Sequence, residues 1–267
     1  MKTDIKQLQR DLKAAVMLGR PEAVDIALDG LLGFPGVASN DRMPEGFIEQ
    51  VILPVGETLS GLKAAQLRPL LAHNLAVGRA VGAVAYACRF IKNSDSTQKD
   101  LRRPGNDPRP DVRLALGKGL FITGPADPEK TLDLGTAWIM KAGPRLRHTA
   151  LVFLPGLVPH YGTGILDLLG QVGTDPDWDV RAALVEALNA FARTSYVEPV
   201  LDLLSRWSAE PHPNSWVICR VLAASWAIDH PSAVKSILQE ISAKTGDSSD
   251  ITHTLKAFKR HGVEIEL

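Results

Sequence analysis

A short run of residues returns at a fixed interval in this chain, and that interval restricts the fold more than any other feature of the sequence. The chain reads Pro110-Asp111-Val112-Arg113, then 34 residues later Pro144-Arg145-Leu146-Arg147, and after a further 34 Trp178-Asp179-Val180-Arg181. Looser copies begin at Trp216 and Ser249. A unit of this length buries its apolar face only by stacking against neighbouring copies. The period therefore predicts a solenoid of repeated helical units.

The apolar residues of each copy recur with helical spacing. Their first members, which we call the anchors, are Val112, Leu146, Val180, Ile218 and Ile251. Apolar or small residues tend to follow each anchor at positions +3, +4, +7 and +8. Partner segments between the copies show the same period, so each repeat is expected to be a helical hairpin. The predicted fold is all-α, a right-handed superhelix of about six hairpins.

The residues before each anchor are typical of helix starts. Proline or tryptophan stands two residues before four of the anchors, at Pro110, Pro144, Trp178 and Trp216. Proline suits the first position of a helix, where an N–H has no partner within the helix. One residue earlier stand residues that cap helices well, namely Gly143, Asp177, Ser215 and Ser248, with Arg109 as the exception.

The two parts of the chain differ in regularity. The repeat is regular over 107–261, whereas 1–92 has helical periodicity without the fixed interval. Irregular hairpins are expected there, with helices over 3–18, from Pro21, and over 45–55, 62–73 and 75–91. The last of these is rich in Ala and Gly, which favours a tightly packed inner helix. The polar segment 93–109 is expected to be a long loop, and its role is left open. One elongated domain, 1–267, is expected.

Composition argues against several classes of function. Lys plus Arg and Asp plus Glu each total 30, so no net charge draws the chain to nucleic acid or to an anionic membrane. The first residues lack the apolar run of a signal peptide, and no stretch approaches the roughly 20 apolar residues of a membrane-spanning helix. Cys88 and Cys219 are expected to be buried thiols in a reducing compartment. We therefore expect a cytoplasmic protein with no membrane partner, and its oligomeric state is left open.

Motifs of catalysis and cofactor binding are missing from the sequence. It contains no HExxH, GxSxG, Walker or GxGxxG motif. Its seven histidines have no Cys or carboxylate partner at the spacing of metal ligands. We expect no cofactor and no metal, and the favoured function involves no catalysis.

The pattern D-P-x-x-D-V-R-x-A-L-x-x-A/G-L, at 107–120 and 175–188, resembles the HEAT-repeat family. In that family the segment forms the turn and the second helix of each hairpin, and the second helices line the concave face of a curved superhelix. The resemblance covers 107–261 and implies a binding surface rather than a particular activity. The function it favours is a non-enzymatic scaffold that holds a protein or peptide partner on its concave face.

Two kinds of side chain are candidates for contact with such a partner. Trp178 and Trp216 either pack onto the preceding turn as hydrophobic staples or form an aromatic wall. The repeat position shared by Arg113, Arg147 and Arg181 either forms a ladder of ion pairs or contacts the partner. The carboxylates available for such a ladder are Asp107, Asp111, Asp175 and Asp179. Arg220 and His148 complete the candidate partner-binding set.

A fainter resemblance supplies a second hypothesis. Trp178-Asp-Val-Arg181 and Trp216-Val-Ile-Cys-Arg220 look like parts of the HEAT-like DNA glycosylases of alkylation repair. That resemblance implies aromatic contacts from the two tryptophans, a catalytic carboxylate from Asp179 or Asp177, and phosphate contacts from Arg181 and Arg220. Two features depart from it: that family is strongly basic, and residues 164–210 hold eight acidic side chains against three arginines. Nucleic acid is therefore the alternative partner and DNA repair the alternative function. HEAT-like chromophore lyases, a third class, share only the repeat.

Overall fold

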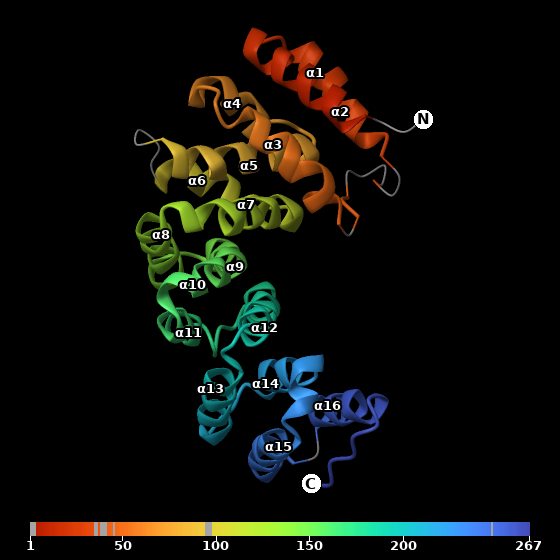
Figure 1. The fold of residues 1–267 in the computed structure, drawn as a ribbon, viewed down its shortest axis with the longest axis vertical. Coiled ribbons are helices and arrows are strands. Elements are labelled where there is room, and N and C mark those ends of the chain that lie inside the picture. The colour runs from red at the N-terminus through yellow and green to blue at the C-terminus, as the bar shows by residue number, and fades with distance from the viewer. Residues whose placement is uncertain (1–3, 35–36, 38–41, 45, 94–97, 247) are drawn as a thin grey trace. The chain divides into compact units, whose positions relative to one another are not determined.

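The computed structural model describes residues 4–34, 37, 42–44, 46–93, 98–246 and 248–267, and every regular element in those ranges is a helix (Figure 1). The all-α fold expected from the repeat is confirmed. The chain forms two compact units, Met1–Trp138 and Ile139–Leu267. The right-handed superhelix and the single-domain organisation stay predictions.

The first unit consists of an N-terminal hairpin followed by helices that surround one central helix. Its elements are α1 (Ile5–Leu18), α2 (Pro21–Leu32), a π-helical turn (Ile48–Ile52), α3 (Leu53–Leu59), α4 (Ala64–Leu71), α5 (Ala76–Lys92), α6 (Gln98–Gly105), α7 (Pro110–Thr123) and a 3-10 turn (Gly124–Ala126). Helix α6 corrects the loop expected over 93–109, of which 94–97 lie outside the described residues. Leu101 and Pro104 are buried, and the packing of α6 against α5 and α7 holds this polar segment as a helix.

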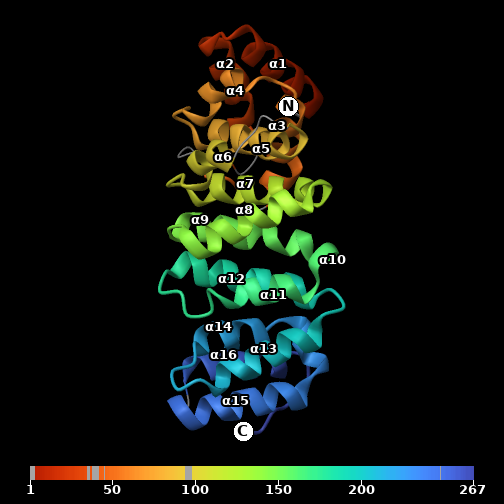
Figure 2. The same cartoon turned by 90° about the vertical axis from the view of Figure 1, so that its left-hand side faces the viewer.

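Helix α5 is buried along nearly its whole length, and α3, α4 and α7 pack against it (Figure 2). Two glycines on the neighbouring helices explain the close approach. A methyl group on Gly119 of α7 would lie 2.9 Å from Cβ of Ala87, and one on Gly56 of α3 would lie 2.6 Å from Cβ of Val84. Both separations are too short for carbon atoms, so only glycine allows this packing. The expectation of a tightly packed inner helix is confirmed.

The second unit is made of helical hairpins stacked in two layers. Its elements are α9 (Pro144–Phe153), a 3-10 turn (Leu154–Leu157), α10 (Val158–Tyr161), α11 (Thr163–Gly170), α12 (Trp178–Ala192), α13 (Val197–Ala209), α14 (Ser215–Leu222), a 3-10 turn (Ser225–Asp229), α15 (Pro231–Thr245) and α16 (Ser249–Arg260). Helix α8 (Pro128–Lys141) crosses the boundary between the units. Helices α9, α12, α14 and α16 pack in succession in one layer, and α11, α13 and α15 form the other (Figure 1).

The helix starts of the α9–α12–α14–α16 layer are capped as expected at three of four positions. Asp177 and Ser248 accept hydrogen bonds from backbone N–H groups three residues on, at 3.1 and 3.4 Å, and Gly143 stands at the start of α9. The cap expected at Ser215 is one residue late, because Asn214 accepts the hydrogen bond from the N–H of Val217. Val217, and not Ile218, is therefore the anchor three residues after the cap of α14.

Candidate functional site

Two tryptophan rings touch at the N-terminal ends of α12 and α14 in the second unit. Trp178 is the first residue of α12 and Trp216 the second residue of α14. Their ring centroids are 4.4 Å apart and the ring planes are inclined by 52°. Trp216 is half-buried, whereas 56% of Trp178 is exposed. The rings thus pack on each other across two repeats, and most of Trp178 remains open to solvent.

Two arginines flank this pair. The Cζ atom of Arg181 lies 5.5 Å from the Trp178 centroid and 5.9 Å from the Trp216 centroid, and that of Arg220 lies 5.7 Å from the Trp216 centroid. These separations are within the range of cation–π attraction. Arg220 Nη1 is also 3.0 Å from Nε2 of His253 on α16. We call these five side chains the Trp–Arg cluster.

The histidine of the cluster is held in its neutral form. Burial lowers the pKa of His253, and the positive charges of Arg220 and Arg260 lower it further. A neutral imidazole has one free lone pair, so Nε2 accepts the hydrogen bond from Arg220 and the ring proton is assigned to Nδ1. At neutral pH the cluster therefore carries two positive charges, one on Arg181 and one on Arg220.

An arginine four residues after the helix cap recurs through both units. It is found in four successive copies, 34 residues apart, as Arg79, Arg113, Arg147 and Arg181. Nε of Arg79 lies 2.7 Å from Oδ2 of Asp107, and Nε of Arg147 lies 2.6 Å from Oδ2 of Asp175. Each aspartate stands two residues before the cap of the next helix in its layer. An Arg–Asp ladder between repeats, one of the two expectations for this position, thus exists at these two steps.

The aspartates and arginines of the ladder also fix the turns around them. Asp175 Oδ1 accepts the N–H of Asp177 at 2.9 Å, and Asp107 Oδ1 accepts the N–H of Arg109 at the same distance. Arg147 Nη1 donates to the carbonyl of Ala142 at 2.6 Å, in the turn before its own helix. An ion pair at each step therefore joins two turns as well as two helices.

Arg113 has a structural role that differs from that of a surface residue. Only 2% of it is exposed, and its Nη1 donates to the carbonyls of Asp107 and Pro108 at 2.9 and 3.2 Å. A partner cannot reach a guanidinium in this position. Arg113 is therefore not part of the surface proposed below, although it was a candidate from the sequence.

Arg181 occupies the same repeat position without the same contacts. The place of Asp175, two residues before the next cap, is taken at this step by His212, because Asn214 is the cap of α14. Within the described part of the chain, the Arg181 guanidinium makes no hydrogen bond and no ion pair, unlike those of Arg79 and Arg147. Its contacts are with the two tryptophan rings. Arg181 is thus the member of the series that the fold leaves available.

The remaining candidates lie outside the cluster. His148 is half-buried on α9, beside the paired Arg147. Asp177 caps α12 through the N–H of Val180, so its carboxylate is engaged in the helix start. Asp179 lies in the first turn of the same helix.

Two residues that matter here, Arg79 and His253, were not among the site candidates from the sequence. Arg79 is found by extending the 34-residue interval backward from Arg113. His253 shares a repeat position with His148, five residues after the cap, but the side-by-side packing of α14 and α16 places it against Arg220.

Comparison with known proteins identifies the repeat. Residues 165–195, which span α11 and α12, match the family model of the HEAT repeat. This is a HEAT-type helical-repeat protein. Repeats of this type suggest a protein-interaction scaffold. No curated protein and no solved structure matches the chain, so the resemblance of this HEAT-type protein to DNA glycosylases has no support from relatives. Among the described residues, no helix combines the length and the apolar character that crossing a membrane requires.

Proposed function

We propose that this HEAT-type protein is a non-enzymatic scaffold and that the Trp–Arg cluster binds an acidic segment of a protein or peptide partner. The observation that carries the proposal is the state of Arg181. Its charge lies within cation–π distance of two aromatic rings and has no carboxylate partner among the described residues, whereas Arg79 and Arg147 at the same repeat position are paired. A free planar guanidinium beside an exposed tryptophan is suited to bind a carboxylate and an apolar side chain together.

The residue types of the cluster support the same partner chemistry. Tryptophan and arginine are the residues most enriched among those that dominate interface energies. Arg181 and Arg220 both lie against Trp216, so their like charges repel each other until an anion joins them. A carboxylate accepts two parallel hydrogen bonds from one guanidinium, which a single point charge such as lysine cannot donate with the same geometry.

Duplex DNA and an alkylated base suit this site less well. The 4.4 Å between the two ring centroids is already a direct contact, so no space for a nucleobase exists between the rings. Asp177 is engaged as a helix cap, so its carboxylate is not free for the catalytic role that the alternative requires. Both observations favour a peptide over nucleic acid.

A cytoplasmic location is part of the proposal. Cys88 and Cys219 are free thiols, and burial raises the pKa of Cys88 to about 11 and that of Cys219 to about 12. Thiols with pKa values this high stay protonated and unreactive at neutral pH. Two such unpaired thiols are typical of proteins from a reducing compartment.

The proposal is tested by selecting a displayed library of random peptides on the purified protein. We expect enrichment of peptides rich in Asp and Glu. Affinities of the enriched peptides, measured by fluorescence anisotropy, should fall about tenfold in Arg181→Ala and in Trp178→Ala, which corresponds to the loss of an interface residue worth 1–2 kcal/mol. Arg181→Lys should also weaken binding, because lysine keeps the charge but not the stacked planar donor.

The matched control is Arg206→Ala, which removes an exposed arginine from α13, in the other layer of the same unit. It makes the same change in net charge and should leave peptide affinity unchanged. Peptides without acidic residues, or acidic peptides whose affinity is equal in wild type and Arg181→Ala, would contradict the proposal. Salt-dependent binding of duplex DNA that disappears in Arg181→Ala would favour the alternative function.

A further inference from the structure

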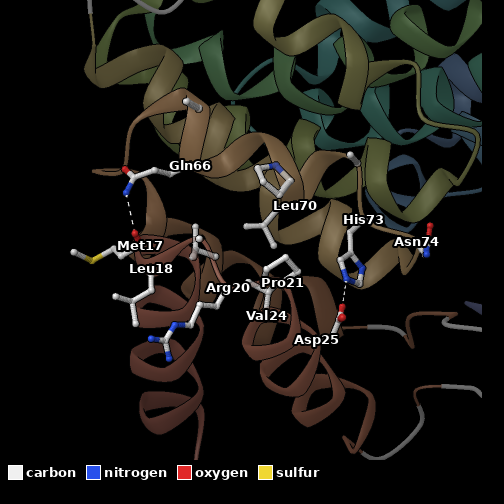
Figure 3. Close-up of a pocket in the computed structure, with 15 residues that line it drawn as sticks. Met17, Leu18, Arg20, Pro21, Val24, Asp25, Gln66, Leu70, His73 and Asn74 are labelled. Carbon is white, nitrogen blue, oxygen red and sulfur yellow. Dashed lines mark hydrogen bonds and ion pairs between the residues drawn. The ribbon is translucent and has the colours of Figure 1, made fainter.

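A second candidate site, unrelated to the Trp–Arg cluster, lies in the first unit. A cavity of about 600 Å³ opens between the α1–α2 hairpin and α4, with the turn after α4 at one end (Figure 3). Small-molecule sites in proteins have volumes of about 300–1,000 Å³. The cavity is therefore large enough for a small ligand.

Hydrogen bonds fix the walls of the cavity at both ends. At one end His73 Nε2 lies 2.8 Å from Asp25 Oδ1, and at the other Gln66 Nε2 donates to the carbonyl of Met17 at 3.5 Å (Figure 3). His73 Nδ1 accepts the N–H of Leu75 at 3.1 Å, so the ring proton is on Nε2 and is donated to Asp25. The two helical layers are thus tied at both ends of the cavity and separated in the middle.

A glycine makes room for the histidine of this tie. A methyl group on Gly78 of α5 would lie 3.0 Å from the His73 ring and 2.9 Å from Leu28 Cδ1. A side chain there would displace the ring from Asp25. The position of His73 at the end of the cavity is therefore set by the packing of α5.

Apolar side chains line most of the cavity, and two of them are exposed although they are not needed for the packing of the core. The lining includes Val16, Met17, Leu18, Pro21, Pro69 and Leu70. Helix α1 buries its apolar stripe through Leu12 and Val16, whereas Met17 and Leu18 at its C-terminal end are 54% and 66% exposed. These two side chains contribute little to the core. They extend the apolar surface of the cavity to its edge, where a ligand could cover them.

Besides His73, the lining contains one basic and one acidic side chain, Arg20 and Asp25, and of these two only Asp25 has a hydrogen-bond partner within the cavity. The Asp25 carboxylate accepts the hydrogen bond from His73 Nε2 at the opposite end of the cavity from Gln66. Arg20 is exposed and stands at the start of α2. Its side chain makes no hydrogen bond or ion pair within the ranges the structure describes. An anionic group next to an apolar body would complement this combination.

We propose that this cavity binds a small molecule with an apolar body and a single carboxylate, which Arg20 recognises. Octanoate is a suitable probe, and 1-octanol is its uncharged match. Binding is followed by the methyl resonance of Met17 in ¹³C-methyl-methionine protein and by calorimetry. We expect a saturable shift of the Met17 resonance with octanoate, and affinity at least tenfold higher for octanoate than for 1-octanol.

Three variants separate the parts of this proposal. Arg20→Ala should reduce octanoate affinity about tenfold and leave 1-octanol unchanged. Ala65→Trp, which places an indole into the cavity from an exposed position on α4, should abolish binding of both probes. Arg10→Ala removes an exposed α1 arginine that already bonds Gln7, outside the cavity, and should change neither affinity.

Several results would overturn the proposal. No saturable shift of Met17 with octanoate, or binding that persists in Ala65→Trp, would rule out this cavity as the site. Equal loss of octanoate affinity in Arg10→Ala and Arg20→Ala would rule out recognition by Arg20. Because the probes and variants lie in the first unit, none of these outcomes bears on peptide binding by the Trp–Arg cluster.

Discussion

Two successive steps of the second unit start from the same arginine position and end differently. From α9 to α12, Arg147 meets Asp175, whose side chain is 6% exposed. From α12 to α14, Arg181 meets no carboxylate among the described residues, because His212 stands where an aspartate stood one repeat earlier. At the step from α9 to α12, the arginine forms an ion pair that joins two repeats. At the step from α12 to α14, the arginine has no such partner and lies beside the two tryptophans.

Some residues at this repeat position stabilise the packing between repeats, and others are available to bind a partner. An arginine repeated at a fixed interval looks like a functional row in the sequence. Pairing shows that Arg79 and Arg147 hold neighbouring turns together, and burial shows that Arg113 does the same within its own turn. A binding surface is therefore best sought at the copy where the joint is missing.

The largest effect is expected from breaking the joint. Asp175→Ala removes the partner of Arg147 and the acceptor for the N–H of Asp177, so a half-buried charge loses its ion pair and a backbone N–H loses its acceptor. We expect the free energy of unfolding to fall by about 3 kcal/mol. Arg181→Ala, at the copy without a joint, should cost about 1 kcal/mol or less, the magnitude of a cation–π contact. Urea denaturation followed by circular dichroism measures both.

The control for this pair is Asp202→Ala, which removes an exposed carboxylate from the middle of α13. Its effect should stay within about 0.5 kcal/mol. If Asp175→Ala costs no more than Asp202→Ala, the ion pair between Arg147 and Asp175 does not stabilise the contact between the two repeats.

A smaller effect is expected from building the missing joint. His212→Asp places a carboxylate at the position that Asp175 occupies one repeat earlier. Because His212 is exposed, the new ion pair should raise stability by less than about 1 kcal/mol. It should nevertheless reduce the affinity for acidic peptides about tenfold, since the carboxylate competes for Arg181. Peptide affinity and unfolding are measured on the same preparation.

His212→Asn is the matched variant, because it replaces the ring by a short side chain without adding charge. It should leave peptide affinity unchanged. Equal losses in His212→Asp and His212→Asn would mean that the ring itself contacts the peptide, and undiminished affinity in His212→Asp would mean that Arg181 is not the contact.

The sequence predicted the periodic parts of this molecule and not the parts where the period changes. The starts of α9, α12 and α16 follow from caps and anchors, and the Ala- and Gly-rich helix is the buried α5. The predicted cap of α14 was wrong by one residue because the interval between successive caps is longer there. Helix α6 was missed because its stability comes from burying Leu101 and Pro104, which a polar composition conceals.

The sequence predicted most of the residues of the candidate site but not how they contact one another. Trp178, Trp216, Arg181 and Arg220 could be singled out as departures from the repeat. Their mutual contact could not, because it depends on the crossing of α12 and α14. The cavity beside Arg20 gave no signal in the sequence at all, since its lining residues come from α1, α2 and α4 and each reads as an ordinary helical residue.

The smallest effect on stability is expected from titrating His253, which contacts Arg220 in the Trp–Arg cluster. Burial first, and then Arg220 and Arg260, lower its pKa from the usual 6.5, so the folded protein holds this imidazole neutral at a pH where the unfolded chain protonates it. The unfolded state then binds more protons, and stability increases with pH. The contribution of His253 is complete above pH 6.5 and declines as the pH falls below it.

Subtracting the unfolding free energies of His253→Gln from those of wild type at several values between pH 5 and 8 cancels the other histidines. The difference should shrink on acidification, and Arg220→Ala should reduce this dependence without removing it, because burial is the larger cause. A difference that stays constant with pH would show that the imidazole is not kept neutral by the fold. The cluster would then gain a third positive charge on mild acidification at no cost in stability, and acidic peptides should bind it more tightly at pH 6 than at pH 8.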